Sequence, residues 1–261
     1  MNPIYSKADI HMHTTCSDGL MTPEALVEYV VANTDFKVIA VTDHETIEGA
    51  QIAKAYADHF ADDFGGLEVI IGSEIRSADA EILALFIEED IPPGLSGEET
   101  IERIHAQRGL AIAAHPYSFI FGLMGKVGMI GAQDRIRDLP FDAVEVINGT
   151  PTELFTNPYT RFRNRQWANL PETGGSDAHY IRSLGATYTQ FPGSTAEDLR
   201  QAIINGQVKP GGRIYNPFLI FNLWIDAATH QIPVKTLPPE RAADWQRVRE
   251  TVLQGELVPA L

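Results

Sequence analysis

The chain has 261 residues, of which 44% are hydrophobic, and this favours one α/β domain of barrel size with a small appendage over two independent domains. Its net charge of −15 and the lack of a basic run predict that duplex nucleic acid is not a partner, because binding would require neutralisation of phosphates. The single cysteine, Cys16, excludes an intramolecular disulfide and favours a reducing, cytoplasmic setting.

Apolar runs alternate with helical patterns over the first two thirds of the chain, which is typical of βαβ units and a parallel sheet. Thr22 and Pro23 predict the N-cap and the first residue of a helix. Further helices are predicted over residues 46–60, 96–107, 158–169 and 195–205. The segment 81–86 is expected to form a hairpin with the segment that ends at Glu74. About seven strand–helix steps result, one short of the usual eight, so the sequence predicts a distorted seven-stranded (β/α)7 barrel over residues 1–209.

From Pro210 onward, prolines divide the chain into short pieces. Residues 218–225 form its most apolar stretch, and residues 239–253 predict an amphipathic helix. We expect residues 210–261 to form a C-terminal extension that packs on the barrel; a membrane or dimer contact of the apolar stretch is the alternative. No segment approaches the roughly 20 apolar residues that span a bilayer, and residues 1–7 lack the pattern of a signal peptide, so no membrane partner is expected. The oligomeric state is not predicted.

Candidate metal ligands follow five strand-like segments at their carboxyl ends, where parallel α/β folds place their chemistry. These ligands are His11, His13, His44, Glu74, His115, Asp177 and His179. On a strand, His11 and His13 point to one face because they are two residues apart. A turn at Gly19 would return the carboxylate of Asp18 to the same place. The pattern predicts a multinuclear metal site, and therefore hydrolysis.

Each candidate taken alone also has an ordinary structural explanation. Asp43 is a possible helix cap beside an exposed His44, Glu74 a possible partner of Arg76, and His115 a possible core histidine. Burying Glu74 without any partner would be too costly, and a bridging position between two metals meets that requirement. Imidazoles and carboxylates without thiolate clusters suit Zn, Mn or Fe.

Four motifs contain all of these candidates except Glu74: Asp9-Ile10-His11-Met12-His13 with Ser17-Asp18-Gly19, Val41-Thr42-Asp43-His44, His115-Pro116, and Gly175-Ser176-Asp177-Ala178-His179. With them the chain resembles the PHP (polymerase and histidinol phosphatase) family, in particular its stand-alone metal-dependent phosphoesterases. The resemblance runs from about residue 8 to residue 186. It implies a distorted barrel of seven strand–helix units and phosphoester hydrolysis at a cluster of two or three divalent metal ions.

By position, the resemblance assigns ligands to each ion. The first ion would be held by His11, His13, Glu74 and Asp177, the second by Asp18, His44 and Glu74, and the third, where it exists, by His115 and His179. This chain departs from three-metal members at Asn148, where they usually carry another histidine or cysteine. Asparagine is a poor ligand for a transition metal, so occupancy of the third site stays open. Glu145 is either a substitute ligand or a structural residue.

The leading hypothesis is hydrolysis of a small phosphorylated substrate, a phosphomonoester and first of all a nucleotide-type phosphate, with inorganic phosphate as product. A metal-bridging hydroxide would attack phosphorus. Asp18, His179 and Arg182 are the catalytic candidates: His179 would stabilise the leaving oxygen, and Arg182 would clamp the phosphate, whose geometry a guanidinium matches.

The same residues are compatible with three other functions. Histidinol phosphate and phosphotyrosyl peptides are alternative substrates of the same reaction. Amidohydrolase-like cleavage of an ester or carbamate would keep the metals and change the bond. A non-catalytic metal-binding accessory module would need partner contacts, for which residues 218–225 are the candidate segment.

Overall fold

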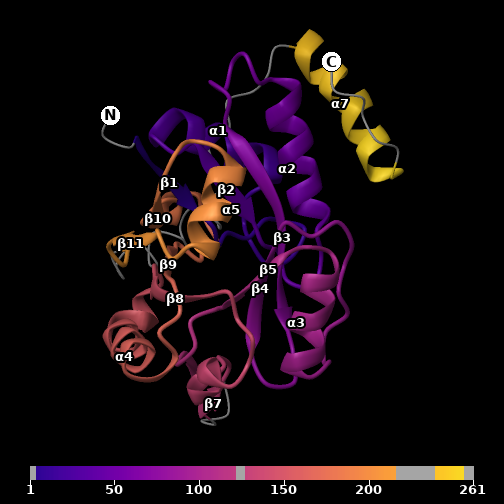
Figure 1. Ribbon diagram of the computed structural model, residues 1–261. Helices are drawn as coiled ribbons and strands as arrows, with labels where there is room; N and C mark the ends of the chain where they lie inside the picture. Colours follow the sequence, from indigo (N-terminus) through magenta and orange to yellow (C-terminus); the bar gives the residue numbers. More distant parts are fainter. Residues whose placement is uncertain (1–3, 122–126, 216–238, 256–261) are drawn as a thin grey trace.

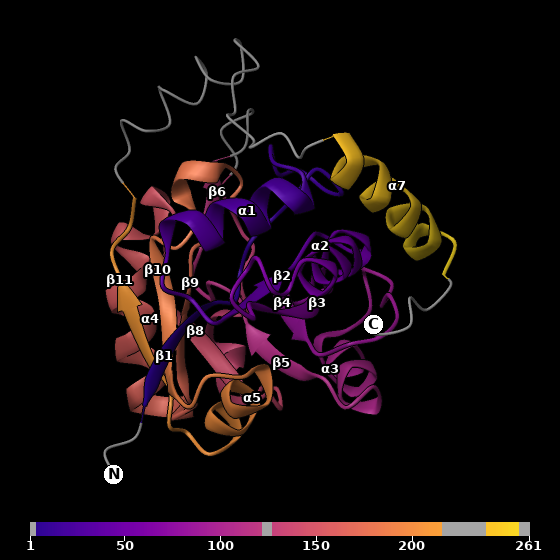
Figure 2. The same ribbon diagram turned by 90° about the horizontal axis from the view of Figure 1, so that it is seen from above.

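The computed structural model describes residues 4–121, 127–215 and 239–255. A nine-stranded sheet lies at its centre, with the order β11-β10-β1-β2-β3-β4-β5-β8-β9 (Figures 1 and 2). The strands of this sheet are β1 (Tyr5–Asp9), β2 (Val38–Val41), β3 (Glu68–Arg76), β4 (Glu81–Leu85), β5 (Leu110–Ala113), β8 (Ala143–Asn148), β9 (Glu172–Gly175), β10 (Thr187–Pro192) and β11 (Lys209–Gly212). A separate two-stranded sheet pairs β6 (Phe119–Phe121) with β7 (Val127–Met129).

The nine-stranded sheet is nearly closed into a barrel. At its seam β9 lies beside β10, where the hydroxyl of Thr189 accepts from the amide of Gly174 at 2.9 Å and donates to its carbonyl at 2.8 Å. Beyond the strand ends, Met12 and Ala178 form a parallel bridge that joins the continuations of β1 and β9. The α/β barrel class is therefore confirmed, whereas the predicted count of seven strands is not.

Two strands of the sheet are not evident from the sequence. β10 follows the last motif and ends on Pro192, and β11 consists of Lys-Pro-Gly-Gly, a composition with low strand propensity. β11 pairs with β10 in antiparallel fashion and lies at one end of the strand order, a position that tolerates proline. Tertiary pairing, and not local propensity, makes these residues strands.

The predicted hairpin is confirmed. β3 and β4 pair in antiparallel fashion with Glu74 opposite Leu83. The pairs β1–β2, β2–β3, β5–β8 and β8–β9 are parallel, so most strands end at the same edge of the barrel.

Helices form where caps and apolar spacing predict them. They are α1 (Pro23–Asn33), α2 (Glu48–His59), α3 (Gly97–Ala106), α4 (Thr156–Arg163), α5 (Ala196–Ile204) and α7 (Pro239–Leu253), with short 3-10 turns at η1 (Gln133–Arg137), η2 (Pro151–Leu154) and η4 (Ile181–Ser183). The hydroxyl of Thr22 accepts from the amide of Ala25, as its N-cap position predicts. α4 ends earlier than predicted, because the chain continues as a π-helical segment, η3 (Asn164–Ala168).

α5 closes the amino-terminal end of the barrel. Its Leu199 and Ile203 belong to one buried cluster with Val38 and Ala143, which are the first residues of β2 and β8. The opposite, carboxyl edge of the parallel strands is left for the functional residues.

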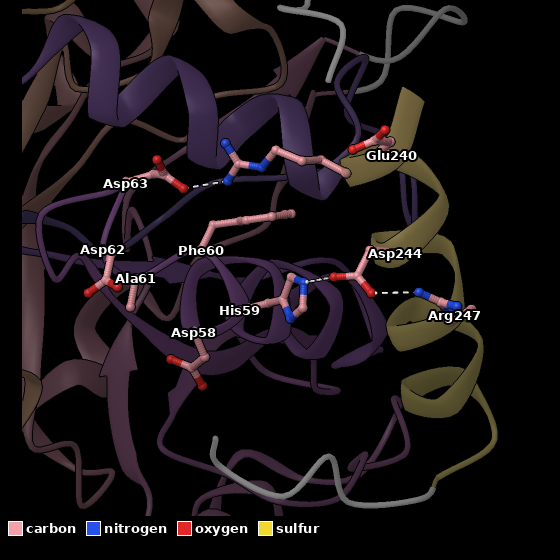
Figure 3. Close-up of a pocket in the computed structure, with 10 residues that line it drawn as sticks. Asp58, His59, Phe60, Ala61, Asp62, Asp63, Glu240, Asp244 and Arg247 are labelled. Atoms are coloured by element: carbon pink, nitrogen blue, oxygen red, sulfur yellow. Dashed lines mark hydrogen bonds and ion pairs between the residues drawn. The ribbon is translucent and has the colours of Figure 1, made fainter. Parts of the chain in front are cut away.

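The C-terminal helix α7 packs on α1 and α2 (Figures 1 and 2). The indole of Trp245 is 4% exposed, lies edge-on to the Tyr56 ring at 4.8 Å and donates to Glu24 at 3.0 Å. Figure 3 shows a second link, in which His59 of α2 lies 2.9 Å from the carboxylate of Asp244. The division of the chain at residue 209 stays a prediction, since β11 straddles it, and the apolar residues 218–225 lie outside the described residues. In the part of the chain that the structure describes, no helix has the length and apolarity needed to cross a membrane.

We expect Trp245→Ala to lower the free energy of unfolding by about 3–5 kcal/mol, as is usual when a buried aromatic side chain is truncated. Urea unfolding followed by circular dichroism measures the loss. Trp167→Ala serves as control, because Trp167 is 40% exposed, and its loss should be clearly smaller. Equal stability of the Trp245 variant and the unaltered chain would contradict the packing of α7.

Candidate metal centre

All eight predicted metal ligands come together at the carboxyl edge of the barrel. They form three groups whose ligand atoms lie within 4.8 Å of one another: His13, Asp18, His44 and His179; His11, Glu74 and His115; and His11, His13 and Asp177. Every member except Asp18 lies in a strand or in the residues directly after one, and these strands are β1, β2, β3, β5 and β9. The strand-end pattern of the sequence thus corresponds to a real cluster in space.

Glu74 lies at the centre of the cluster and is 1% exposed. Its Oε2 atom is 3.2 Å from His11 Nε2, 3.3 Å from His13 Nε2 and 3.5 Å from His44 Nδ1. Its Oε1 atom is 3.0 Å from His115 Nε2. One carboxylate therefore contacts four imidazoles that come from three other strands.

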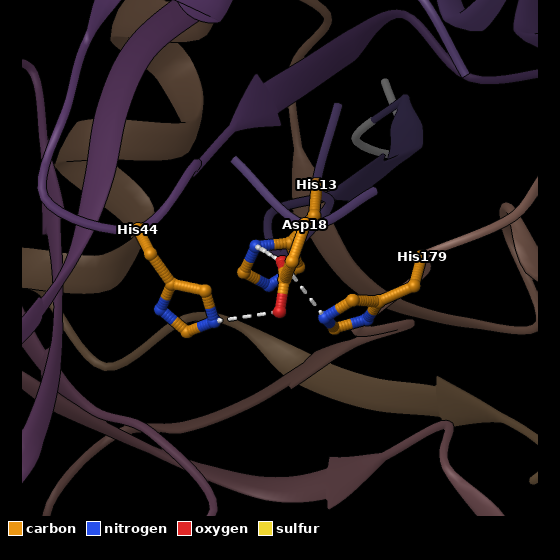
Figure 4. A group of neighbouring side chains, drawn as sticks. All are labelled: His13, Asp18, His44 and His179. Carbon is orange, nitrogen blue, oxygen red and sulfur yellow. Dashed lines mark ion pairs between the residues drawn. The ribbon is translucent and has the colours of Figure 1, made fainter. Parts of the chain in front are cut away.

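Asp18 reaches the cluster from the loop after β1, as the turn at Gly19 predicts. Figure 4 shows its carboxylate between three imidazoles, 3.3 Å from His179, 3.6 Å from His44 and 3.8 Å from His13. A Cβ atom at Gly19 would lie only 2.4 Å from the carbonyl oxygen of His13. The close return of the loop thus requires glycine. Asp18 is also the exposed ligand, with 57% of its side chain accessible.

The backbone at two candidate ligands is left-handed, with φ of 53° at Asp177 and 23° at His115. Such conformations are uncommon for residues other than glycine, and aspartate and histidine adopt them more readily than most. The amide of Asp177 donates to the carbonyl of His11 at 2.8 Å. This contact places Asp177 Oδ1 at 3.3 Å from His13 Nε2 and 3.5 Å from His11 Nε2.

The charges of the cluster stabilise one another. Burial opposes ionisation of Glu74, but the charges and hydrogen bonds of His11 and His115 together outweigh it and hold the pKa of this carboxyl well below its usual range. Asp177 has the same balance, and its pKa is also well below normal. Burial disfavours the charged form of His115, yet the hydrogen bond to Glu74 raises its pKa to about 10. The carboxylates are therefore in the ionised form that metal binding needs.

The residues of the cluster fit a divalent transition metal. Within the described residues, both ring nitrogens of His13 and Nδ1 of His44 are buried without a hydrogen-bond partner, an arrangement that is costly in a folded protein. A metal ion bound to one nitrogen of each ring and to the adjacent carboxylates would satisfy that nitrogen. Mixed imidazole and carboxylate donors suit Zn, Mn or Fe and do not choose among these metals.

Comparison with known proteins identifies the family. The model of the PHP domain matches residues 9–147, which is more than half of the chain, and the model described as PHP-associated matches residues 162–208. The protein belongs to the PHP family. An uncharacterized protein of Methanocaldococcus jannaschii is 44% identical to this PHP protein over 153 residues, which are 54% of the chain and 81% of the relative.

A solved structure supports the same fold. It is a two-domain protein from Bacteroides vulgatus that contains a predicted PHP-like metal-dependent phosphoesterase, with a TM-score of 0.62 and 18% identity over 81% of this chain and 66% of that one. A phosphoribosyl 1,2-cyclic phosphate 1,2-diphosphodiesterase of Eggerthella lenta is 34% identical over 106 residues, 38% of each chain. One similar protein is thus named as an enzyme that cleaves a phosphodiester.

The prediction that excludes duplex nucleic acid is wrong. Endonuclease Q in complex with a 27-mer duplex substrate shares the fold of this chain, with a TM-score of 0.52 and 15% identity over 80% of this chain and 60% of that one. A 5'-3' exoribonuclease of Haemophilus influenzae is 39% identical over 71 residues, 27% of this chain and 24% of the relative. The net charge of the chain does not exclude a nucleic-acid partner, because it describes the whole surface, whereas bound ions would dominate the local electric field at the site.

The assignment of ligands to individual ions stays a prediction. His115 and His179, the expected ligands of a third ion, lie in separate groups, one with Glu74 and the other with Asp18. Arg182 lies in the turn η4, three residues after His179, and its side chain is exposed. Its role as a phosphate clamp stays a prediction.

Two buried aspartates hold the motif loops, and their roles are not evident from the sequence. Asp43 accepts from the amide of Thr14 at 2.7 Å and from the hydroxyl of Ser17 at 2.6 Å, which fixes the loop that carries Asp18. Asp9 accepts from the amide of Ser176 at 2.9 Å. Asp43 directly precedes His44, and Asp9 lies two residues before His11. This position within the motifs is the signal that the sequence offers for their roles.

Proposed function

We propose that this PHP protein is a metal-dependent phosphoesterase that hydrolyses a small phosphomonoester, first of all a nucleotide-type phosphate. The observation that carries the proposal is the buried carboxylate of Glu74, which contacts four imidazoles at the carboxyl edge of the barrel. Such a set of nitrogen and oxygen donors would hold two or three ions of Zn, Mn or Fe. When bound, these ions would lower the pKa of water towards neutrality and offset the charge of a phosphoryl group.

Residues in the interior of the site would hold the ions, and residues at its rim would contact the substrate. His11, His13 and Glu74 are buried and would fix the positions of the ions. Asp18 and His179 are more accessible, at 57% and 33% of their side chains. The substrate would therefore approach from the side of Asp18 and His179, where His179 would stabilise the leaving oxygen. Arg182, the exposed residue of the turn that follows, is the proposed contact for the phosphate.

Phosphodiester cleavage is the second candidate, because a diphosphodiesterase and endonuclease Q are among the similar proteins. The same donors would serve it, since neither reaction requires a protein nucleophile at the metals. The two differ in that a diester carries a second ester group, which stays on phosphorus after cleavage and needs room at the site. Specificity for monoesters is therefore part of the proposal to be tested.

A substrate screen on metal-reconstituted protein tests the proposal. The panel comprises nucleoside monophosphates, histidinol phosphate, a phosphotyrosyl peptide, an aryl phosphodiester, short single- and double-stranded oligonucleotides and an aryl carbamate. We expect release of inorganic phosphate from a nucleotide, abolished by a chelator and restored by added metal. Preferred cleavage of the diester or an oligonucleotide would refute monoester specificity, and cleavage of the carbamate alone would refute phosphoester chemistry. Metal binding without turnover of any compound would favour an accessory module.

A further inference from the structure

Behind the candidate ligands lie two buried polar side chains of β8, Glu145 and Asn148, which are 1% and 0% exposed. Glu145 Oε1 is 3.0 Å from His11 Nδ1. Glu145 Oε2 accepts from the backbone amide of His115 at 3.1 Å and from Asn148 Nδ2 at 3.0 Å. Asn148 Nδ2 also donates to Asp177 Oδ2 at 3.1 Å. The pair thus contacts candidate ligands that follow β1, β5 and β9.

An irregularity in β8 allows both side chains to face the cluster. On a regular strand, residues three apart point to opposite faces. The pairing of β8 with β9 shifts its register between Glu145 and Ile147, and a bulge of this kind re-aims the side chains that follow it. The local distortion of β8 therefore has a direct effect on the site.

The directions of these hydrogen bonds are fixed by chemistry. A carboxylate only accepts, so the contact with Glu145 places the imidazole proton of His11 on Nδ1. In the metal-loaded protein the opposite nitrogen, Nε2, would present its lone pair on the side of Glu74 and Asp177, whereas without metal a proton on Nε2 contacts these carboxylates. The amide of Asn148 is oriented in the same way, because its Oδ1 accepts from the amide of Thr150 at 2.9 Å and its Nδ2 must point to the carboxylates.

We propose that Glu145 and Asn148 are positioning residues of the metal centre and not metal ligands. Glu145 fixes the tautomer and ring orientation of His11, and Asn148 holds Asp177 Oδ2 so that Oδ1 is directed at His11 and His13. Both oxygens of Glu145 are already engaged by donors of the chain. The inference rests on the proposed function, because it concerns how the same metal groups are held.

The test compares Zn²⁺ affinity and stoichiometry, measured by competition with a chromogenic chelator, in the unaltered chain and in Glu145→Gln. The NH2 group of the glutamine would then face the backbone amide of His115 and the side-chain amide of Asn148, which are also hydrogen-bond donors. We expect Zn²⁺ affinity to fall by about 10–100-fold, as for other residues that orient ligands, with the same number of ions bound at saturation. Glu153→Gln is the matched control, since Glu153 is 3% exposed and accepts from the hydroxyls of Ser118 and Thr156, and its affinity should be unchanged.

Different outcomes overturn different claims. Unchanged affinity in Glu145→Gln would refute positioning, and the loss of one bound ion at saturation would identify Glu145 as a ligand. No Zn²⁺ binding by the unaltered chain would refute the proposed function as well.

A measurement on the unaltered chain keeps the inference falsifiable even if a variant fails to fold. Nitrogen-15 NMR of the zinc-loaded protein should show His11 protonated at Nδ1 and bound through Nε2. Binding through Nδ1 would refute the proposal. Asn148→Ala should give a smaller loss of affinity than Glu145→Gln, because it leaves the contact between Glu145 and His11 in place.

Discussion

Glu74→Gln should lower phosphoesterase activity on the order of 1000-fold or more, equivalent to about 4 kcal/mol of transition-state stabilisation. The glutamine keeps the size of the side chain but removes the charge that contacts four imidazoles. The group of His11, Glu74 and His115 would then lose its carboxylate, and the contacts of residue 74 with His13 and His44 would weaken, so that metals would bind weakly there. The measurements are steady-state rates with the best substrate of the screen and the number of ions bound per chain.

The control for Glu74→Gln is Glu28→Gln on α1. Glu28 accepts from the hydroxyl of Tyr56 at 2.6 Å and belongs to no ligand group, so its variant should keep full activity. Circular dichroism establishes that both variants are folded. A Glu74→Gln protein that binds the full number of ions and retains more than about a tenth of the activity would contradict the central position of this carboxylate.

His44→Ala should lower activity by about 100–1000-fold while the fold persists. His44 is 15% exposed at the side chain and lies at the rim of the cluster, between Asp18 and Glu74. Truncation there removes one donor of the most accessible group without opening the core. Because the resulting space faces solvent, added imidazole should bind in it and restore part of the activity.

His105→Ala is the matched control for His44→Ala. His105 lies on α3 and pairs with Asp142 at 2.9 Å, away from the ligand groups. Its variant should match the activity of the unaltered chain and show no response to imidazole. If His44→Ala is fully active, His44 is not a metal ligand.

The positions of the ligands were predictable because strand ends are a local signal. Apolar runs that end in His11, His44 or Glu74 identify both the strand and the edge that it points to. Helix starts were equally local: Thr22 caps α1 and Ser96 caps α3 as the sequence indicates.

Features that depend on pairing across the barrel were not predictable. β11 becomes a strand only through β10, and no property of Lys-Pro-Gly-Gly predicts that pairing. The division of ligands into groups depends on which strands are neighbours, and no local pattern indicates that His115 lies with Glu74 and His179 with Asp18. The place of Glu145 behind His11 depends on the register shift of β8, which leaves no trace in the hydrophobic pattern.

The bridge between Met12 and Ala178 has a consequence for how the molecule acquires its site. The group formed by His11, His13 and Asp177 joins the first and the last parallel strands, which are separated by most of the barrel sequence. Contacts of such separation carry a high entropic cost of loop closure and form late in folding. Competence to bind metal at this group should therefore arise only when the barrel has closed, and metal binding would act as a reporter of complete folding.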